Sequence, residues 1–319
     1  MTPHRPGRAR LRLRPGRLLA LWLLLLPLAQ ADEGPHQVLL LLSADSPPYR
    51  ELAMALTASL GPVEQRQLDL RVRTVGDRPL PTGNDLVVTA GVRALRQVLE
   101  HPDDTPLLAT FLPEASYRRL HPPASRPGSA LFIDQPPSRY LDLVRAALPR
   151  ARHIGLIASP YSQPLLPALR RAATRRDLVL RIEPLESERE LARLIRRLFP
   201  RSDALLALAD PGVYNRRTLK NLLLASYRQG LPVIGYSRSL VRAGALAAVY
   251  TTPSQMGLQL AETLSAWMRD PGHALPPPRH PDYFVVDVNR PLARALGLAI
   301  PHESVLMDRI TRFEKEGRG

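Results

Sequence analysis

The sequence contains no cysteine and very little lysine. None of its 319 residues is cysteine, and its lysines are Lys220 and Lys315. The absence of thiols excludes disulfide bonds, cysteine nucleophiles and cysteine-ligated metals together. The stability of the folded chain must therefore come from packed cores, and its positive charge is carried almost entirely by arginine.

Motifs that carry catalysis or bind cofactors are also missing. The sequence has no phosphate-binding loop GxxxxGK[ST], no dinucleotide fingerprint GxGxxG and no nucleophile elbow GxSxG. Its eight histidines are isolated, and no pair has the HxxxH spacing of a helical metal site. We therefore predict no catalytic residue, no metal site and no cofactor, and we expect a protein that is not an enzyme.

The first 31 residues have the composition of a secretory signal peptide. Residues 1–17 hold six arginines and no acid, and an apolar run follows that ends in Ala29, Gln30 and Ala31. The run is shorter than the roughly 20 residues that a membrane-spanning helix needs, and the small residues suit a signal peptidase. The pattern predicts cleavage and a soluble periplasmic protein; an uncleaved amino-terminal anchor is the alternative.

The charge that remains after this leader is strongly positive. Removing its six arginines from the net charge of +15 leaves about +9. Such a charge can attract anionic ligands, nucleic acid or acidic lipid. The arginines, however, come in scattered pairs on segments whose other face is apolar, which indicates solvated helix surfaces, and no nucleic-acid motif accompanies them. We therefore predict no nucleic-acid partner. The pairs are Arg170 and Arg171, Arg175 and Arg176, Arg196 and Arg197, and Arg216 and Arg217.

Short apolar runs alternate with longer segments of helical periodicity along the rest of the chain. The predicted strands cover residues 37–42, 85–91, 106–111, 130–134, 153–158, 204–209, 232–236, 246–250 and 283–288, with an additional strand at 68–72. Nearly continuous apolar runs suit strands that are buried on both faces of a parallel sheet. The pattern predicts an α/β protein, and a length of about 288 residues after the leader predicts two domains.

Several helix signals lie between these runs. Ser187 and Glu190 have the spacing of a capping box. Ser138 is available as the cap of a predicted helix over residues 138–148, and Gly230 suits a left-handed helix end. One helix carries an apolar stripe that we interpret as core packing. The stripe consists of Met256, Leu260, Leu264 and Trp267.

Polar residues and tyrosines gather where the predicted strands end. Ligands of open α/β sheets bind just past the carboxyl ends of the strands. Five of the nine tyrosines lie at such ends, and tyrosine can stack on a planar ligand while its hydroxyl forms hydrogen bonds. The alternative is that serine and aspartate cap helices there and that tyrosine favours sheet edges. The predicted ligand-binding residues are Ser43, Asp45, Tyr49, Gly91, Ser159, Tyr161, Asp210, Tyr214, Ser237, Arg238 and Tyr250.

The carboxyl-terminal half resembles the ABC transporter substrate-binding proteins of the family that includes tryptophan and tyrosine binders. The resemblance is carried by Asp210 at a strand end, PVIG at 232–235, AGAL at 243–246, Gly257 in a helix, and a closing segment. That segment runs from Asn289 through Leu296 and Gly297 to Ile300 and Pro301. The run DLVVTAGVRALRQVL resembles the family's amino-lobe strand and helix, so the resemblance covers about residues 85–301.

This resemblance implies a type I periplasmic binding protein fold, in which two doubly wound parallel-sheet lobes are joined by a three-strand hinge. The implied amino-terminal lobe is 32–134 plus 251–281, and the carboxyl-terminal lobe is 135–250 plus 282–319, with crossovers near Asp134, Tyr250 and Asp282. The implied function is that a monomer captures an amino acid-like or aromatic small molecule and delivers it to an ABC permease. The alternatives are a sensor or adaptor of the cell envelope, and an envelope hydrolase built on an α/β sheet.

Overall fold

A computed structural model describes residues 1–2, 34–77, 80–101, 103–270 and 272–316. Apart from Met1 and Thr2, the predicted signal peptide lies outside the described residues. The fold described below belongs to the unit that begins at Pro35. Within the described ranges, no helix has both the length and the hydropathy that crossing a bilayer requires.

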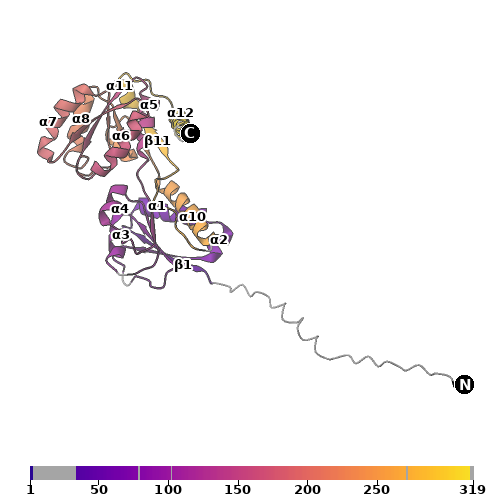
Figure 1. Ribbon diagram of the computed structural model, residues 1–319. Coiled ribbons are helices and arrows are strands. Elements are labelled where there is room, and N and C mark those ends of the chain that lie inside the picture. Colours follow the sequence, from indigo (N-terminus) through magenta and orange to yellow (C-terminus); the bar gives the residue numbers. More distant parts are fainter. Residues whose placement is uncertain (3–33, 78–79, 102, 271, 317–319) are drawn as a thin grey trace. The chain divides into compact units, whose positions relative to one another are not determined.

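The first sheet, whose strand β1 is labelled in Figure 1, is parallel throughout and has the strand order β2-β1-β3-β4-β5. Its strands are β1 (His36–Leu42), β2 (Leu68–Thr74), β3 (Leu86–Ala90), β4 (Leu107–Thr110) and β5 (Gly128–Leu131). The helices around it are α1 (Pro47–Ser59), α2 (Pro62–Gln67), α3 (Val92–Leu99), α4 (Glu114–Leu120) and α10 (Pro253–Arg269). Successive leucines of β1 point to opposite faces, with Leu40 packing toward α1 and α10 and Leu41 packing toward α3. The run of leucines is thus explained by burial on both faces.

The second sheet has the order β11-β10-β9-β8-β6-β7 and is parallel except for the antiparallel pair β10 and β11. Its strands are β6 (His153–Ala158), β7 (Val179–Pro184), β8 (Ala204–Leu206), β9 (Val233–Gly235), β10 (Ala247–Tyr250) and β11 (Val285–Val288). The accompanying helices are α5 (Pro137–Ala147), α6 (Leu166–Thr174), α7 (Leu191–Leu198), α8 (Leu219–Arg228), α9 (Arg238–Ala243), α11 (Arg290–Ala295) and α12 (Glu303–Glu316), with 3-10 turns η1 (Gln163–Leu165), η2 (Glu188–Glu190) and η3 (Phe199–Arg201).

Both sheets are covered by helices on their two faces, which confirms the predicted α/β, doubly wound architecture. All ten predicted strands are present with small shifts at their ends. The prediction missed β7, whose sequence VLRIEP includes Arg181 and Glu183 and which forms a partly exposed edge of the sheet. A strand that is exposed on one edge does not need the continuous apolar run by which most of the others were recognised.

One of the predicted helix caps is wrong, one is present without its reciprocal bond, and two other helix signals are confirmed. Ser187 accepts a hydrogen bond from the Arg189 amide, and a 3-10 turn precedes α7, so Ser187 and Glu190 do not form a capping box. Ser138 lies inside α5, because Pro137 already begins that helix. Gly230 has the expected left-handed conformation, with φ of 64°. The predicted stripe on α10, from Met256 to Trp267, is fully buried.

Within the described part of the chain, the backbone passes between the two sheets three times. It leaves the first sheet after β5, returns to it between β10 and α10, and leaves it again between α10 and β11. Asp134, Tyr250 and Asp282 lie in or beside these three passages. The residue boundaries of the two lobes given above stay a prediction.

Helix α10 is fixed at its start and packed closely against α1. Thr252 and Gln255 form a reciprocal capping box, in which each side chain accepts a hydrogen bond from the other residue's backbone amide. One turn later, Gly257 faces the backbone of α1 near Leu52 and Ala55. A side chain at this position would hold the two helices apart.

Replacing Gly257 with alanine tests this helix contact. The added Cβ would lie 2.5 Å from the Leu52 carbonyl oxygen and 2.7 Å from the Ala55 Cβ, so α1 and α10 would have to separate. We expect the free energy of unfolding to fall by about 1–3 kcal/mol, measured by urea denaturation. The control is Ala266→Leu on the exposed face of α10, which should change it by less than about 0.5 kcal/mol. Equal values for the two variants would contradict the close packing.

Candidate functional site

Three of the predicted residues meet where β1 and β3 end. Ser43 Oγ accepts a hydrogen bond from the Ala94 amide in the first turn of α3, at 2.9 Å. Gly91 has φ of 89°, and a Cβ there would lie 2.6 Å from both Ser43 Oγ and Tyr49 Oη. Glycine is therefore required by both its backbone conformation and its neighbours. Asp45 does not join this group; it is exposed and pairs with Arg50 at 2.7 Å.

Asp210 lies at the centre of a buried network at the ends of β6 and β8. Its carboxylate accepts hydrogen bonds from Ser159 Oγ at 2.6 Å, the Ser159 amide at 2.9 Å, Ser162 Oγ at 2.5 Å and the Gly212 amide at 2.9 Å. The residue is only 1% exposed. In this structure the carboxylate therefore holds two loops together, whereas the sequence predicted Asp210 as a ligand-binding residue.

Tyr214 is a core residue. It is 7% exposed and belongs to the apolar cluster under α7 and α8, with its ring 6.3 Å from that of Tyr236. Burial raises the pKa of its hydroxyl well above the ordinary value for tyrosine. The ring thus packs in the core, as the packing alternative describes, and a ligand contact of Tyr214 stays a prediction.

Ser237, Arg238 and Tyr250 lie together at the ends of β9 and β10. Ser237 caps α9 by accepting a hydrogen bond from the Leu240 amide at 3.2 Å. The Arg238 guanidinium donates to Tyr250 Oη at 2.8 Å and to Asp287 at 2.9 Å, and Tyr250 Oη donates to Asp287 at 2.7 Å. These polar groups satisfy one another at the surface.

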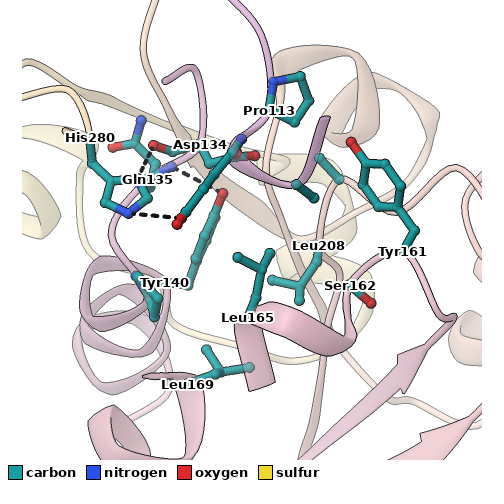
Figure 2. Close-up of a pocket in the computed structure, with 14 residues that line it drawn as sticks. Pro113, Asp134, Gln135, Tyr140, Tyr161, Ser162, Leu165, Leu169, Leu208 and His280 are labelled. Carbon is teal, nitrogen blue, oxygen red and sulfur yellow. Dashed lines mark hydrogen bonds and ion pairs between the residues drawn. The ribbon is translucent and has the colours of Figure 1, made fainter. Parts of the chain in front are cut away.

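A narrow pocket adjoins the first and third passages between the sheets, and of the predicted residues only Tyr161 lines it (Figure 2). Its free volume is about 20 Å³, room for roughly one water-sized group. Figure 2 shows Tyr161 on the opposite side of the pocket from His280. The lining residues are Pro113, Glu114, Ala115, Asp134, Gln135, Pro137, Tyr140, Tyr161, Ser162, Leu165, Leu169, Leu208, Ala209 and His280.

Three titratable side chains form the polar wall of this pocket. His280 Nε2 lies 3.4 Å from Glu114 Oε2, and His280 Nδ1 lies 3.1 Å from the Asp134 carbonyl oxygen. Asp134 accepts a hydrogen bond from the Glu114 amide at 2.5 Å. Outside the pocket, Arg118 pairs with Glu114 at 2.7 Å. The wall thus carries the carboxyl groups of Glu114 and Asp134. Arg118, which lies behind the wall, is the partner cation of Glu114.

The pKa values of this wall are shifted mainly by burial. Burial raises the pKa of Asp134 to about 6; the Glu114 amide opposes the shift and the Glu114 charge adds to it. Because the pKa is raised on folding, Asp134 favours the folded state most below its unfolded pKa, and that contribution is lost as the pH rises through about 6. Burial also lowers the pKa of His280. The ionised form of Asp134 is therefore poorly stabilised, and a cation beside its carboxylate would stabilise that form.

Sequence reasoning missed Glu114, Asp134 and His280 as site residues. Glu114 opens a short helix, and His280 lies in a proline-rich segment that looks like a linker. Asp134 follows the run ALFI and was noticed only as a crossover. Among the described residues, no group of three or more His, Asp or Glu side chains is spaced to hold a metal ion.

On the side of the pocket lined by Tyr161, a hydrogen bond joins segments attached to different sheets. Tyr161 Oη and Ser116 Oγ lie 2.8 Å apart, joining the turn after β6 to α4. Tyr161 also lines a wider groove of about 470 Å³, together with Arg119, Ser159, Glu186 and Gly212. The narrow pocket and the wider groove thus share Tyr161 as a lining residue.

Replacing Asp210 with alanine tests the structural role of its carboxylate. Two serine hydroxyls and two amides would lose their acceptor in a buried place, so we expect the free energy of unfolding to fall by about 2–4 kcal/mol. Chemical denaturation followed by circular dichroism measures it. The control is Asp287→Ala, which removes a partly exposed carboxylate and should cost about 1 kcal/mol or less. A loss no larger than that of the control would show that the network is unimportant for folding.

Comparison with known proteins agrees with this architecture. The family model described as ABC transporter substrate binding protein matches residues 84–306. Among the curated proteins, none matches. Solved structures that are similar include the ABC domain of Streptococcus pneumonia in complex with L-Trp, at 18% identity and a TM-score of 0.59, with 86% of this chain and 98% of that chain covered.

A ligand-free, open substrate-binding protein with adhesive properties from Clostridium difficile is 17% identical, with a TM-score of 0.66 and coverage of 83% of this chain and 96% of that one. A conserved domain protein from Vibrio cholerae is 19% identical, with a TM-score of 0.58 and coverage of 85% and 97%. These likenesses show the fold, that of type I periplasmic binding proteins. Since the family model spans more than half of the sequence, the chain belongs to the ABC transporter substrate-binding protein family.

Proposed function

We propose that this protein captures a small solute between its two lobes in the periplasm and delivers it to an ABC permease. The observation that carries the proposal is the pocket whose wall combines Glu114 and Asp134 with Tyr161 and Leu208, residues that follow strands of both sheets. Closure of two lobes around such a pocket buries the solute and changes the surface that a permease contacts. The proposed function then depends on a conformational change of the protein.

The composition of the pocket supports a solute with an amino group and an apolar body. Glu114 and Asp134 supply negative charge in a buried place, while Leu165, Leu169 and Leu208 supply apolar surface. A protonated amine suits the acidic wall because it would stabilise the ionised form of Asp134. The similar structure that holds L-Trp is consistent with this class, which also includes the predicted amino acid-like and aromatic ligands.

The size of the pocket indicates how such a solute would fit. A volume of about 20 Å³ accepts an ammonium group but not an aromatic ring. The wider groove on the other side of Tyr161 would hold the body of the ligand. Binding then requires the Tyr161–Ser116 contact to open, which couples ligand entry to a contact between segments attached to different sheets.

A second function, that of a sensor or adaptor without transport, is favoured by a different observation. Several polar residues at the strand ends are already satisfied by one another, namely Ser43 with Ala94, Asp210 with two serines, and Arg238 with Asp287. A binding-protein fold whose strand ends are closed in this way would serve as a docking module. The experiment below separates the two.

Thermal unfolding with three related indoles tests the proposed solute class. L-tryptophan carries both charged groups, tryptamine carries only the amine, and indole-3-propionate carries only the carboxylate. We expect the two amines to raise the unfolding temperature and the acid to have no effect, since a ligand at about 100 times its Kd adds about 2.7 kcal/mol. The same panel on Tyr161→Ala should give smaller shifts.

Each other outcome contradicts part of the proposal. Stabilisation by indole-3-propionate alone would overturn the acidic pocket as the binding determinant. If the protein responds neither to the indoles nor to wider panels of amino acids, purines, peptides and anions, the result would contradict solute capture and favour the adaptor function.

The pH dependence of tryptamine affinity tests the role of Asp134. Ionised Asp134 attracts the ammonium group and protonated Asp134 does not, so the affinity should fall about tenfold as the pH drops from 7.5 to 5, through the pKa of about 6. Glu114 and His280 face the same pocket, and protonation of His280 acts in the same direction. Isothermal titration calorimetry measures the profile. Asp134→Asn should bind more weakly at pH 7.5 and show a flatter profile; an unchanged slope would assign the titration to His280.

A further inference from the structure

Arg139, at the start of α5, forms the centre of a buried network at the passages between the lobes. The residue is 3% exposed. Its Nη1 donates to Gln135 Oε1 at 2.8 Å and to the Pro281 carbonyl oxygen at 2.9 Å, and its Nε donates to Glu314 at 2.6 Å. Its guanidinium also lies 4.4 Å from the centre of the Phe284 ring. One side chain thus contacts the first passage, the third passage and helix α12.

The network continues into the second passage. Gln135 Nε2 donates to Thr251 Oγ1 at 2.8 Å, and Thr251 Oγ1 donates to the Tyr283 carbonyl oxygen at 2.6 Å. Gln135 and Thr251 are both buried. All three passages are therefore joined by an unbroken chain of hydrogen bonds that begins at Arg139.

The third passage is also held from the side of the first sheet. Gln259 of α10, which is fully buried, donates to the Asp282 carboxylate at 2.6 Å and accepts from the Asp282 amide at 3.0 Å. Pro281 and Asp282 are adjacent in sequence. Arg139 of α5 and Gln259 of α10 therefore form hydrogen bonds with the same short backbone segment from helices of different lobes. Rotation of one lobe against the other changes the backbone angles of such a turn.

We propose that Arg139 is a positioning residue that sets the equilibrium between lobe arrangements, and that Glu314 makes α12 part of the hinge. A buried guanidinium keeps its charge at any physiological pH and is costly to leave unpaired. The lobe arrangement that satisfies all of its partners is favoured over arrangements that separate the passages. Arg139 thereby links the three passages, so that they change together. The inference needs the two lobes but not the identity of the solute.

The absence of native cysteine makes this proposal directly measurable. Arg96→Cys in α3 and Lys220→Cys in α8 are exposed positions on helices that cover different sheets, and they would be the only thiols in the chain. Spin labels at these two positions report the distribution of distances between the lobes by double electron–electron resonance. The background with native Arg139 gives the reference distribution.

Arg139→Met in this background should produce a second, shifted population of interlobe distances. Losing one charge-assisted hydrogen bond is enough to raise a minor population about tenfold or more. Arg139→Lys, which keeps the charge but not the planar fork, should give an intermediate distribution. Glu314→Gln, a milder change, should shift the distribution in the same direction as Arg139→Met and serves as the test if that variant does not fold.

The matched control is Arg176→Met. Arg176, whose side chain is 9% exposed, is also an arginine of the second lobe and pairs with the fully buried Asp142 through two hydrogen bonds of 2.7 Å, but its guanidinium donates to Asp142 and Ala172, within the α5 and α6 layer. It should lower thermal stability without moving the distance distribution. The proposal is overturned if Arg139→Met and Glu314→Gln keep the reference distribution, or if Arg176→Met changes it as much as they do.

Discussion

Within the residues that the structure describes, the backbone passes between the two sheets three times, and this connectivity controls what lies near the passages. Segments that end at Asp134, Thr251 and Pro281 are brought together from distant parts of the sequence, and their polar groups cannot be satisfied by regular strand pairing. Side chains supply the missing partners instead, as Gln135 does for Thr251 and Arg139 does for the Pro281 carbonyl. The acidic pocket adjoins this region, so its shape depends on how the passages are held.

Two aspartates that follow strands show how surroundings separate a structural role from a functional one. Asp210 receives four hydrogen bonds from hydroxyls and amides, which consume its capacity as an acceptor. Asp134 receives one from a backbone amide, lies near the charge of Glu114, and has a pKa raised to about 6. The first carboxylate is stabilised by the fold, whereas the second still gains from a cation. The ligand contact that the sequence suggested for Asp210 therefore suits Asp134 better.

The fold could be predicted from the sequence far more completely than the site. Most of the ten predicted strands are buried on both faces and carry uninterrupted apolar runs, so they were visible, while the edge strand β7, with Arg181 and Glu183, was not. Tyr161 was found because it follows a strand. Glu114 and His280 are far apart in sequence and lie in segments that resemble surface loops; they meet only because the chain returns from one lobe to the other. No local sequence pattern indicates such a contact between residues far apart in the chain.

The near absence of lysine gains a physical meaning from these contacts. The paired arginines that suggested simple solvated surfaces include Arg176, which pairs with the buried Asp142, and Arg197, which pairs with Glu183. Arg290 donates to the Ile300 and Pro301 carbonyl oxygens and to Glu303, holding the segment before α12. A guanidinium presents several donors in one rigid plane and can join three segments, whereas an ammonium group acts as a point charge. In a chain without disulfides, arginine at such positions provides cross-links that are strong yet reversible.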